Sequence, residues 1–255
     1  MAPRAQRAIF TVHLIEGVFS HRGKIDGAKM FSTMKLAGWV VGFACACALG
    51  LWLVPSGRAA APFPNPALDD PLADKPGQAT AVLAGGCFWG VEAVFEHVKG
   101  VTNAVSGYSG GPARSASYEL VESGSTGHAE TVQITFDPSQ VSYGTLLRIF
   151  FGVAHNPTEL NRQGPDIGPQ YRSVIFYANP RQQMIAERYI AQLGEVRQFS
   201  RPIVTQVVPL TAFYPAEAYH QDYAFHHPTA PYIVINDRPK VYELKREYAD
   251  LYRDR

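Results

Sequence analysis

Cysteine is scarce in this sequence, with three among 255 residues. Three cysteines cannot build the disulfide framework of a small secreted domain. Two of them, Cys45 and Cys47, lie in an apolar run, where cysteine is more often a small hydrophobic residue than half of a metal or redox pair. Cys87 is therefore the single cysteine in the body of the chain and the first candidate for chemistry.

Net charge is nearly absent as well, because 23 Lys and Arg oppose 22 Asp and Glu. This balance gives no electrostatic support for a nucleic-acid partner. Residues 1–59 carry seven basic and two acidic groups, which leaves 16 basic and 20 acidic groups in the remainder. With 46% hydrophobic and 18% charged residues and no visible internal repeat, the composition is that of a globular protein.

An uncharged run of 19 residues, 36–54, follows Lys35 and precedes small residues. This pattern is typical of a bacterial export signal within residues 34–59, cleaved after Ala59, with the periplasm as the destination. Met34 and Lys35 make a short basic start, so residues 1–33 are a candidate start-site artefact. The alternative is an uncleaved membrane anchor, because 19 apolar residues just cross a bilayer at about 1.5 Å per residue.

The rest of the chain divides into two parts by composition. Residues 60–78 are rich in proline and aspartate and are predicted to be a tether. Residues 79–255 have the length and apolar content of a single domain.

Local patterning in residues 79–255 predicts a mixture of strands and helices. Strands are expected at residues 81–84, 130–136, 171–177 and 203–208. Helices are expected from the Gly-Gly turn to Gly100, from Ser142 through Phe151, from Pro180 to about Leu193, and over residues 240–252. This mixture favours an α+β fold of two packed layers. Residues 103–128 and 152–170 are predicted to be long loops, where functional residues are often found.

Cys87 stands where Gly85 and Gly86 turn a buried strand into a helix. The helix amides and the positive end of the helix dipole favour the thiolate at such a position. Phe88 and Trp89 place aromatic surface beside the thiol. Cys87 is therefore predicted to be a reactive nucleophile rather than an inert buried cysteine.

Glu130 opens a segment that alternates between apolar and polar residues up to Phe136. It has the same parity as Val132 and Ile134, so its carboxyl group is expected on the core side of the strand. Burial there raises the pKa and lets the carboxyl group carry a proton near neutral pH. The alternative, an exposed carboxylate at the strand end, is equally compatible with the parity.

A thiolate needs an acid only when the group that it attacks must lose an oxygen or an amine. Cys87 and Glu130 together therefore narrow the chemistry to acyl transfer or deoxygenation.

Several sequence blocks in a fixed order then make a family recognisable. They are GGCFWG at residues 85–90, GYSGG at 107–111, SGSTGHAE at 123–130 and NRQGPD at 161–166, followed by QYRS at 170–173, HQDY at 220–223 and PKV at 239–241. Over roughly residues 79–245 the chain resembles the A-type peptide methionine sulfoxide reductases. Residues 79–255 would then be the reductase catalytic domain.

The resemblance implies a two-layer α/β sandwich with a ferredoxin-like plait core and long loops. It also implies reduction of methionine (S)-S-oxide, free or in oxidised proteins, and hence protein repair. Cys87 would attack the sulfoxide sulfur and become a sulfenic acid while Glu130 protonates the oxygen. Tyr118 and Tyr171 would hydrogen-bond that oxygen.

Substrate binding and recycling follow from the same resemblance. Phe88 and Trp89 would form the pocket for the S-methyl group, and Asp166 would help to hold the substrate backbone. Many members resolve the sulfenic acid with further cysteines near the C-terminus, but no cysteine follows Cys87. With no bound cofactor or metal expected, the partners would be oxidised proteins and an external thiol reductant, such as a dithiol or a membrane-linked thioredoxin-like protein.

Three rival functions use other residues. A cysteine hydrolase would pair Cys87 with one of three histidines as base, His128, His155 or His220. A metal-binding module would use His220, His226 and His227, although their spacing is not that of a helical zinc site. A plain peptide-binding module would present an aromatic groove made of Tyr108, Tyr118, Tyr171, Phe213 and Tyr214.

Overall fold

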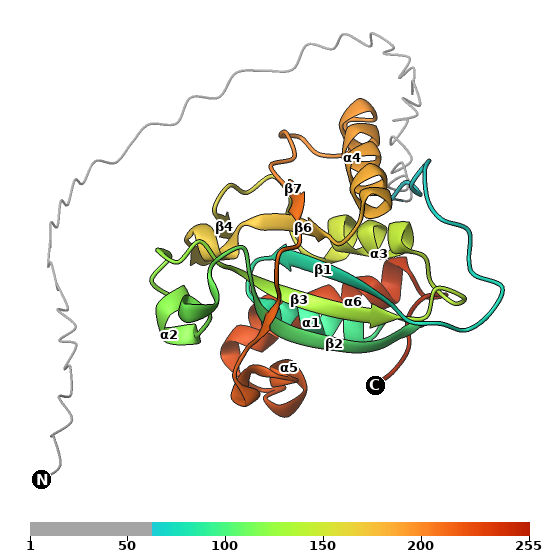
Figure 1. The fold of residues 1–255 in the computed structure, drawn as a ribbon. Helices are drawn as coiled ribbons and strands as arrows, with labels where there is room; N and C mark the ends of the chain where they lie inside the picture. The colour runs from blue at the N-terminus through green and yellow to red at the C-terminus, as the bar shows by residue number, and fades with distance from the viewer. Residues whose placement is uncertain (1–62) are drawn as a thin grey trace, which may run out of the picture. The chain divides into compact units, whose positions relative to one another are not determined.

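The computed structural model describes residues 63–255 (Figure 1). The predicted leader at residues 34–59 and the candidate artefact at residues 1–33 lie outside the described residues. Within 63–255, no helix combines the length and the hydropathy that a bilayer crossing requires.

Six strands form one mixed sheet in the described part of the chain. Their order across the sheet is β7-β6-β1-β3-β2-β8, in which β7 pairs parallel with β6 and every other pair is antiparallel. The bounds are β1 Ala79–Gly85, β2 Val101–Ser109, β3 Ala129–Phe136, β6 Ser173–Tyr177, β7 Gln206–Pro209 and β8 Tyr214–Pro215. A separate two-stranded ribbon is made by β4 Arg162–Gln163 and β5 Asp166–Ile167.

The α-helices are α1 Phe88–Glu96, α2 Tyr118–Val121, α3 Tyr143–Ile149, α4 Pro180–Glu195, α5 Tyr223–His226 and α6 Arg238–Glu247. Helix α3 continues as a π-helical turn over Phe150–Ala154, and a second π-helical turn, Ile233–Asp237, leads into α6. Short 3₁₀ turns occupy Ala113–Ser115, Pro169–Tyr171 and Ala218–His220.

Helices α1, α3 and α4 contribute buried apolar residues to one large core against the sheet, which also includes Leu244 of α6 (Figure 1). The order β1-α1-β2-β3-α3-β6, with β1 and β3 central, is the ferredoxin-like plait, so the predicted two-layer α+β fold is confirmed. Strand alternation explains the layers, because Ala81 and Leu83 of β1 join this core while Val82 and Ala84 face the other side.

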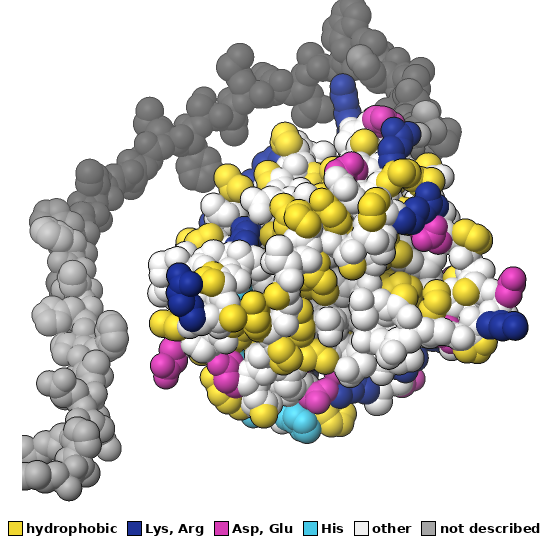
Figure 2. Space-filling model, in the orientation of Figure 1, with side chains coloured by type: hydrophobic (Ala, Val, Ile, Leu, Met, Phe, Trp, Pro, Cys, Tyr) yellow, Lys and Arg dark blue, Asp and Glu magenta, His cyan; other side chains and the backbone are white. Residues whose placement is uncertain are grey.

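The second face of the sheet carries a smaller apolar cluster that includes Val174 and Phe176 of β6. Val208 of β7, together with Leu210 and Phe213 from the chain that follows β7, packs against this cluster. Hydrophobic side chains gather in the middle of the face shown in Figure 2, and acidic and basic side chains lie mainly toward its edge.

Helix starts agree with the caps expected from the sequence. Ser142 accepts a hydrogen bond from the N–H of Thr145 at 3.1 Å at the start of α3. Asn179 accepts from the N–H of Gln182 at 2.9 Å at the start of α4, where proline takes the first helical position.

Several predicted boundaries are wrong. Helix α1 ends before Gly100, β6 begins at Ser173 rather than at residue 171, and residues 152–170 are not one loop because they contain β4 and β5. Residues 103–128 are not one loop, because they include most of β2 and all of α2. Strand β7 begins at Gln206 rather than at residue 203, and α6 spans Arg238–Glu247 rather than 240–252. Strand β2 reads VTNAVSGYS, a polar and glycine-containing segment, and its pairing with β3 and β8 makes it a strand.

The segment predicted as a tether is attached to the domain from Phe63 onward. Tyr189 of α4 donates its hydroxyl to the carbonyl of Pro64 at 2.7 Å, and Asp69 accepts the N–H of Gly144 in α3 at 2.8 Å. Proline-rich composition indicates an extended backbone, but these long-range hydrogen bonds decide that the extended chain lies on the helical layer.

Candidate active site

Cys87 lies between β1 and α1, at the position that caps the helix. Gly86 before it has φ of 95°, a left-handed conformation that glycine adopts without strain. Cys87 is a free cysteine, in no disulfide, and is only 8% exposed. The Gly-Gly turn therefore delivers the thiol to the start of a helix within the protein core.

Burial raises the pKa of the Cys87 thiol well above its ordinary value, and the carboxyl groups of Glu130 and Asp237 raise it further. The backbone N–H of Trp89 and the Lys240 ammonium group act in the opposite direction. The prediction that the helix start favours the thiolate is therefore wrong for the free protein. Loss of water around the sulfur outweighs the helix amides, so the resting cysteine is a thiol.

Glu130 lies on the core side of β3, as the alternation predicts, and is 3% exposed. Its Oε2 accepts the backbone N–H of Phe88, the residue after Cys87, at 3.0 Å. Burial raises the pKa of this carboxyl group to about 8, and the neighbouring Asp166 contributes in the same direction. Glu130 therefore carries a proton at pH 7 and is fixed beside the first turn of α1.

Tyr118 and Tyr171 come from separate segments, the start of α2 and the end of the Pro169–Tyr171 turn. Burial raises the pKa of both phenols, to about 12 for Tyr118, and the charges of Glu130 and Cys87 add to both effects. Both hydroxyls therefore stay protonated as hydrogen-bond donors. Because they share these two neighbours, the structure brings the predicted acid, nucleophile and phenols into one site.

The predicted substrate-binding residues surround the same centre. Phe88 is 1% exposed and its ring lies 5.9 Å from that of Tyr108. Trp89 is partly buried and stacks on Tyr223 with 3.8 Å between ring centroids. Asp166 on β5 accepts a hydrogen bond from the hydroxyl of Tyr232, a residue that sequence reasoning missed.

A buried ion pair lies against the first turn of α1. Asp237 is fully buried and its Oδ1 lies 3.2 Å from Lys240 Nζ, while its Oδ2 has no hydrogen-bond partner in residues 63–255. A side chain at Gly90 would collide with both groups. Glycine at this position therefore lets the ion pair approach the helix close to Cys87.

Glu217 is a second residue that sequence reasoning missed. It accepts hydrogen bonds from the hydroxyl of Tyr108 and from the backbone N–H of Tyr118, both at 2.9 Å. These contacts join residues about 100 positions apart, so no local pattern could reveal them. Glu217 fixes the backbone at which the Tyr118 phenol originates.

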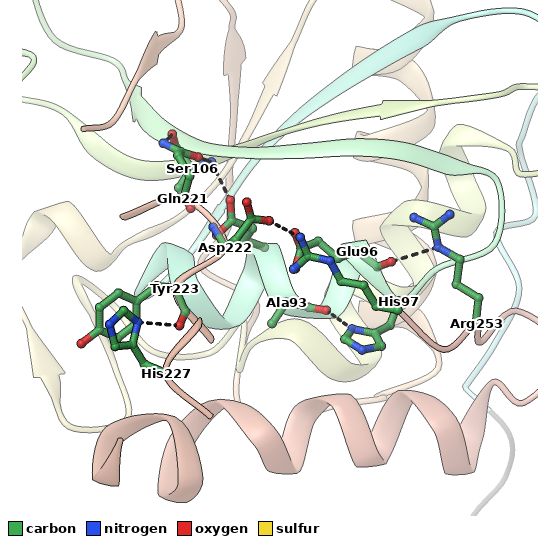
Figure 3. A network of polar contacts seen from close by, with 11 residues as sticks. Ala93, Glu96, His97, Ser106, Gln221, Asp222, Tyr223, His227 and Arg253 are labelled. Atoms are coloured by element: carbon green, nitrogen blue, oxygen red, sulfur yellow. Dashed lines mark hydrogen bonds and ion pairs between the residues drawn. The ribbon is translucent and has the colours of Figure 1, made fainter. Parts of the chain in front are cut away.

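The segment around Glu217 is itself held on α1 and β2 by a buried polar network (Figure 3). Gln221 pairs with both backbone groups of Ser106 at 2.9 Å, and Glu92 accepts the N–H of Asp222 at 3.1 Å. Burial raises the pKa of Glu92 to about 7, and Arg255 binds Glu96 at 2.7 Å. The network anchors the HQDY block as a support for the site.

The rival histidine bases have other partners. His155 is hydrogen-bonded to Ser173 at 2.7 Å and to a backbone carbonyl, and burial lowers its pKa to about 3. His128 binds Gly111 and Pro112, and His220 binds Trp89. Within the part of the chain that is described, none of the three forms a hydrogen bond with Cys87, so the hydrolase lacks an assembled base.

The other two rivals also lack an assembled site. Among residues 63–255 no three His, Cys, Asp or Glu side chains are grouped to hold a metal ion. Tyr108, assigned to an aromatic groove, is fully buried, and Phe213 covers the small cluster on the other face of the sheet. The aromatic set is therefore divided between the core and the site.

Comparison with known proteins adds independent information. The family described as peptide methionine sulfoxide reductase matches residues 79–251. A peptide methionine sulfoxide reductase MsrA 2 of Mesorhizobium japonicum is 57% identical over 180 residues, covering 71% of this chain and 92% of that protein. A Synechocystis protein of the same name is 49% identical over 190 residues, covering 74% and 89%. The solved methionine sulfoxide reductase A of Corynebacterium diphtheriae is similar with a TM-score of 0.53 and 34% identity, covering 62% of this chain and 78% of that one.

Proposed function

The chain belongs to the peptide methionine sulfoxide reductase family and reduces methionine sulfoxide, and we propose that it does so by attack of Cys87 on the S-epimer. The observation that carries this proposal is the pairing of the Cys87 thiol with a buried carboxyl group, Glu130, which is protonated at pH 7. A sulfoxide oxygen is a poor leaving group until it is protonated. The pair supplies a nucleophile for sulfur and a proton for oxygen.

The proposed reaction forms a bond between Cys87 Sγ and the sulfoxide sulfur while Glu130 protonates the oxygen. Cys87 reacts after its thiol proton has passed to solvent, the hydroxyl group formed on the substrate passes to Cys87 as methionine leaves, and Glu130 then regains a proton from solvent. Thiol and sulfoxide are thereby converted into sulfenic acid and thioether, so cysteine is oxidised and the substrate is reduced. Tyr118 and Tyr171 donate to the oxygen as its charge develops.

Stereochemical selection follows from the two sides of this site. Phe88 and Trp89 offer apolar surface for the S-methyl group, whereas Glu130 and the two phenols offer donors for the oxygen. Cys87 approaches the sulfur from a third direction, so the methyl group and the oxygen each have one place in the site. Exchange of oxygen and methyl in the other epimer would place oxygen against apolar rings and methyl against donors.

Cys87 is the single cysteine among the described residues, and the other two belong to the predicted leader. We therefore propose that an external thiol, supplied by a thioredoxin-like protein or a small dithiol, reduces the sulfenic acid. The external thiol attacks the sulfenic sulfur, releases water and forms a mixed disulfide, which a second thiol then opens.

A single-turnover experiment tests the proposed function. The protein is mixed with each methionine sulfoxide epimer without reductant, and we expect about one methionine per protein from the S-epimer alone. A sulfenic-acid reagent should label Cys87, and a dithiol should restart turnover. Equal reaction of both epimers, or methionine formation with Cys87 still a free thiol, would contradict the mechanism.

We also propose that the chain is exported and cleaved after Ala59. Support comes from the uncharged run at residues 36–54 and from the attachment of the chain to the domain from Phe63 onward, which this cleavage would preserve. The mass of the protein isolated from a bacterial periplasm should then correspond to a start at Ala60. A full-length protein in the membrane fraction would instead establish the anchor.

A further inference from the structure

The buried ion pair of Asp237 and Lys240 takes no part in the proposed reaction, although it lies beside the nucleophile. The Asp237 side chain is fully buried and the Lys240 side chain is 20% exposed, with 3.2 Å between Oδ1 and Nζ. Moving two charges out of water costs about as much free energy as their attraction returns, so a buried ion pair is weak evidence for stability. The position of the pair in the molecule therefore has to explain it.

Both the ion pair and the thiol lie at the first turn of α1. Cys87 caps this helix, and a capping side chain lies over the N–H groups of the second and third helical residues. The third residue is Gly90, and a Cβ atom there would collide with Oδ1 of Asp237 and with Nζ of Lys240. The two charges and the sulfur are therefore grouped around the same short stretch of backbone.

The segment that carries the pair holds both charges in fixed places. Asp237 ends the π-helical turn Ile233–Asp237, and Lys240 lies in the first turn of α6, three residues later. Lys240 is the partner of Oδ1, whereas Oδ2 is buried with no hydrogen-bond partner among residues 63–255. A buried charge that hydrogen bonds and water compensate only in part acts strongly on its neighbours. Cys87 is one of those neighbours.

Several other titratable groups face the same centre, and most of them are neutral at pH 7. Burial raises the pKa of Glu130 to about 8 and lowers that of His155 to about 3. Asp166, which binds the Tyr232 hydroxyl, is a carboxyl group that faces Asp237. Burial keeps the phenols that face Cys87 protonated, and they are Tyr118, Tyr171 and Tyr232.

The charges that act on the sulfur have opposite signs. Burial is the main reason why the pKa of the Cys87 thiol is raised, and the carboxyl groups of Glu130 and Asp237 add to it. The Lys240 ammonium group lowers that pKa. Because Glu130 is protonated at pH 7, Asp237 is the carboxylate that opposes a thiolate there, and Lys240 is the cation that balances one.

We propose that Asp237 and Lys240 control the ionisation of Cys87: Lys240 balances the charge of the thiolate, and Asp237 offsets Lys240 in the resting protein. The inference rests on the proposed function only for the role of Cys87 as the nucleophile. Oxidants attack the thiolate rather than the thiol, so a resting thiol is protected between turnovers. Both are positioning residues, because they act on the reaction through the charge of Cys87.

Alkylation of Cys87 measures its thiolate without any sulfoxide. Cys45→Ser and Cys47→Ser leave Cys87 as the single thiol of the full chain, and iodoacetamide is added at pH 9, well above the ordinary pKa of a carboxyl group. We expect the rate to fall about threefold in Lys240→Met and to rise about threefold in Asp237→Asn. An about tenfold change in thiolate population has this smaller effect on the rate, because a less basic thiolate is a weaker nucleophile.

The opposite directions of the two changes are the decisive result. Loss of either partner leaves an unpaired buried charge, so a purely structural role predicts that both variants lose stability and change reactivity in the same direction. Lys240→Arg keeps the charge and should stay within about twofold of the unmodified rate. Rates that move in the same direction in the two single variants, or that stay unchanged in either, would overturn the proposal.

The double variant Lys240→Met/Asp237→Asn covers the case in which a single variant does not fold. It contains no unpaired charge at this place and should therefore fold. Its alkylation should be about threefold slower than that of Asp237→Asn, which retains Lys240, and about threefold faster than that of Lys240→Met, which retains Asp237. Equal rates in the comparison that remains would refute the control of Cys87 by these charges.

An exposed ion pair of the same helix is the matched control. Lys245 Nζ lies 3.3 Å from Asp254 Oδ1, and both side chains are more than half exposed. Lys245→Met and Asp254→Asn change the net charge of the protein as the test variants do, and they should leave the alkylation rate unchanged. Changes as large as those in the test variants would show that net charge, rather than the buried pair, sets the rate.

The alkylation result is independent of the proposed function. Activity in Cys87→Ser would refute the proposed function, whereas opposite alkylation changes would still establish that the pair controls Cys87. If Cys87→Ser is inactive and alkylation ignores both charges, the proposed function stands and this inference is wrong.

Discussion

Cys87→Ser is expected to form no methionine, with turnover reduced by roughly three orders of magnitude or more. A serine hydroxyl is a far weaker nucleophile toward sulfur than a thiol, and oxygen cannot take the place of sulfur in a sulfenic acid. The measurement is methionine released from the S-epimer with excess dithiothreitol. Since Cys87 is 8% exposed and the substitution is nearly isosteric, the variant should fold normally.

The chain contains its own controls for this experiment. Cys45→Ser and Cys47→Ser alter the two cysteines of the predicted leader and should retain the full rate. A near-ultraviolet circular dichroism spectrum that matches the unmodified protein would exclude misfolding of the Cys87 variant. Substantial activity in Cys87→Ser, or loss of activity in a leader variant, would remove Cys87 from its role.

Glu130→Gln is expected to slow sulfenic-acid formation by about a hundredfold or more. Glutamine keeps an oxygen that accepts the N–H of Phe88, as Glu130 does at 3.0 Å, but it has no proton to give to the sulfoxide oxygen. Substrate affinity should therefore change little. Rapid-quench measurement of methionine in the first turnover provides the rate, and an unchanged rate would mean that another group is the acid.

The pH dependence of the same step should differ between the two proteins. The reactive pair is a thiolate and a protonated carboxyl group, which together hold one proton fewer than the resting pair. Because burial raises the pKa of Glu130 to about 8 and that of Cys87 well above its ordinary value, the rate should rise up to about pH 8 and fall when the second proton is lost. The rising and falling limbs of this pH–rate profile report the titration of the coupled pair, Cys87 and Glu130, rather than of either residue alone.

Glu130→Gln leaves Cys87 as the titrating member of the pair. The rate of the variant should rise with pH to a plateau and show no descending limb, because the thiolate is the nucleophile and the amide does not titrate. The ascending limb should lie at lower pH than the thiol pKa of the unmodified protein, since the Glu130 charge that raises that pKa is gone. A descending limb that persists in the variant would assign it to a different group.

Local periodicity predicted well those elements in which buried residues recur at the spacing of a strand or a helix. Strand β3 alternates from Val132 to Phe136, and its parity made a buried Glu130 one of two expectations, which the 3% exposure of this residue confirms. Helices α3 and α4 follow side-chain caps at Ser142 and Asn179. Strand β2 has no such pattern in its sequence. It is a strand because its pairing with β3 and β8 supplies backbone hydrogen bonds, which its composition does not predict.

The residues of the site likewise fall into those that the sequence indicated and those that only the structure revealed. Cys87 after a Gly-Gly turn is a local signal, and the family resemblance implied the two phenols and Asp166. Glu217, His220 and Tyr232 act through partners 66 to 131 positions away in the chain, a separation at which no spacing rule applies. Their contribution becomes visible only when the chain segments meet.

The sequence by itself determined the α+β layering and the family, and it predicted Cys87 as the nucleophile and Glu130 as the acid, because each depends on neighbouring residues or on ordered motifs. The tertiary structure alone decided the protonation of Cys87, since the water that the sulfur loses is displaced by residues from distant segments. It likewise decided that the proline-rich chain around Pro64 and Asp69 lies on the helical layer, because hydrogen bonds to α3 and α4 hold the extended chain there.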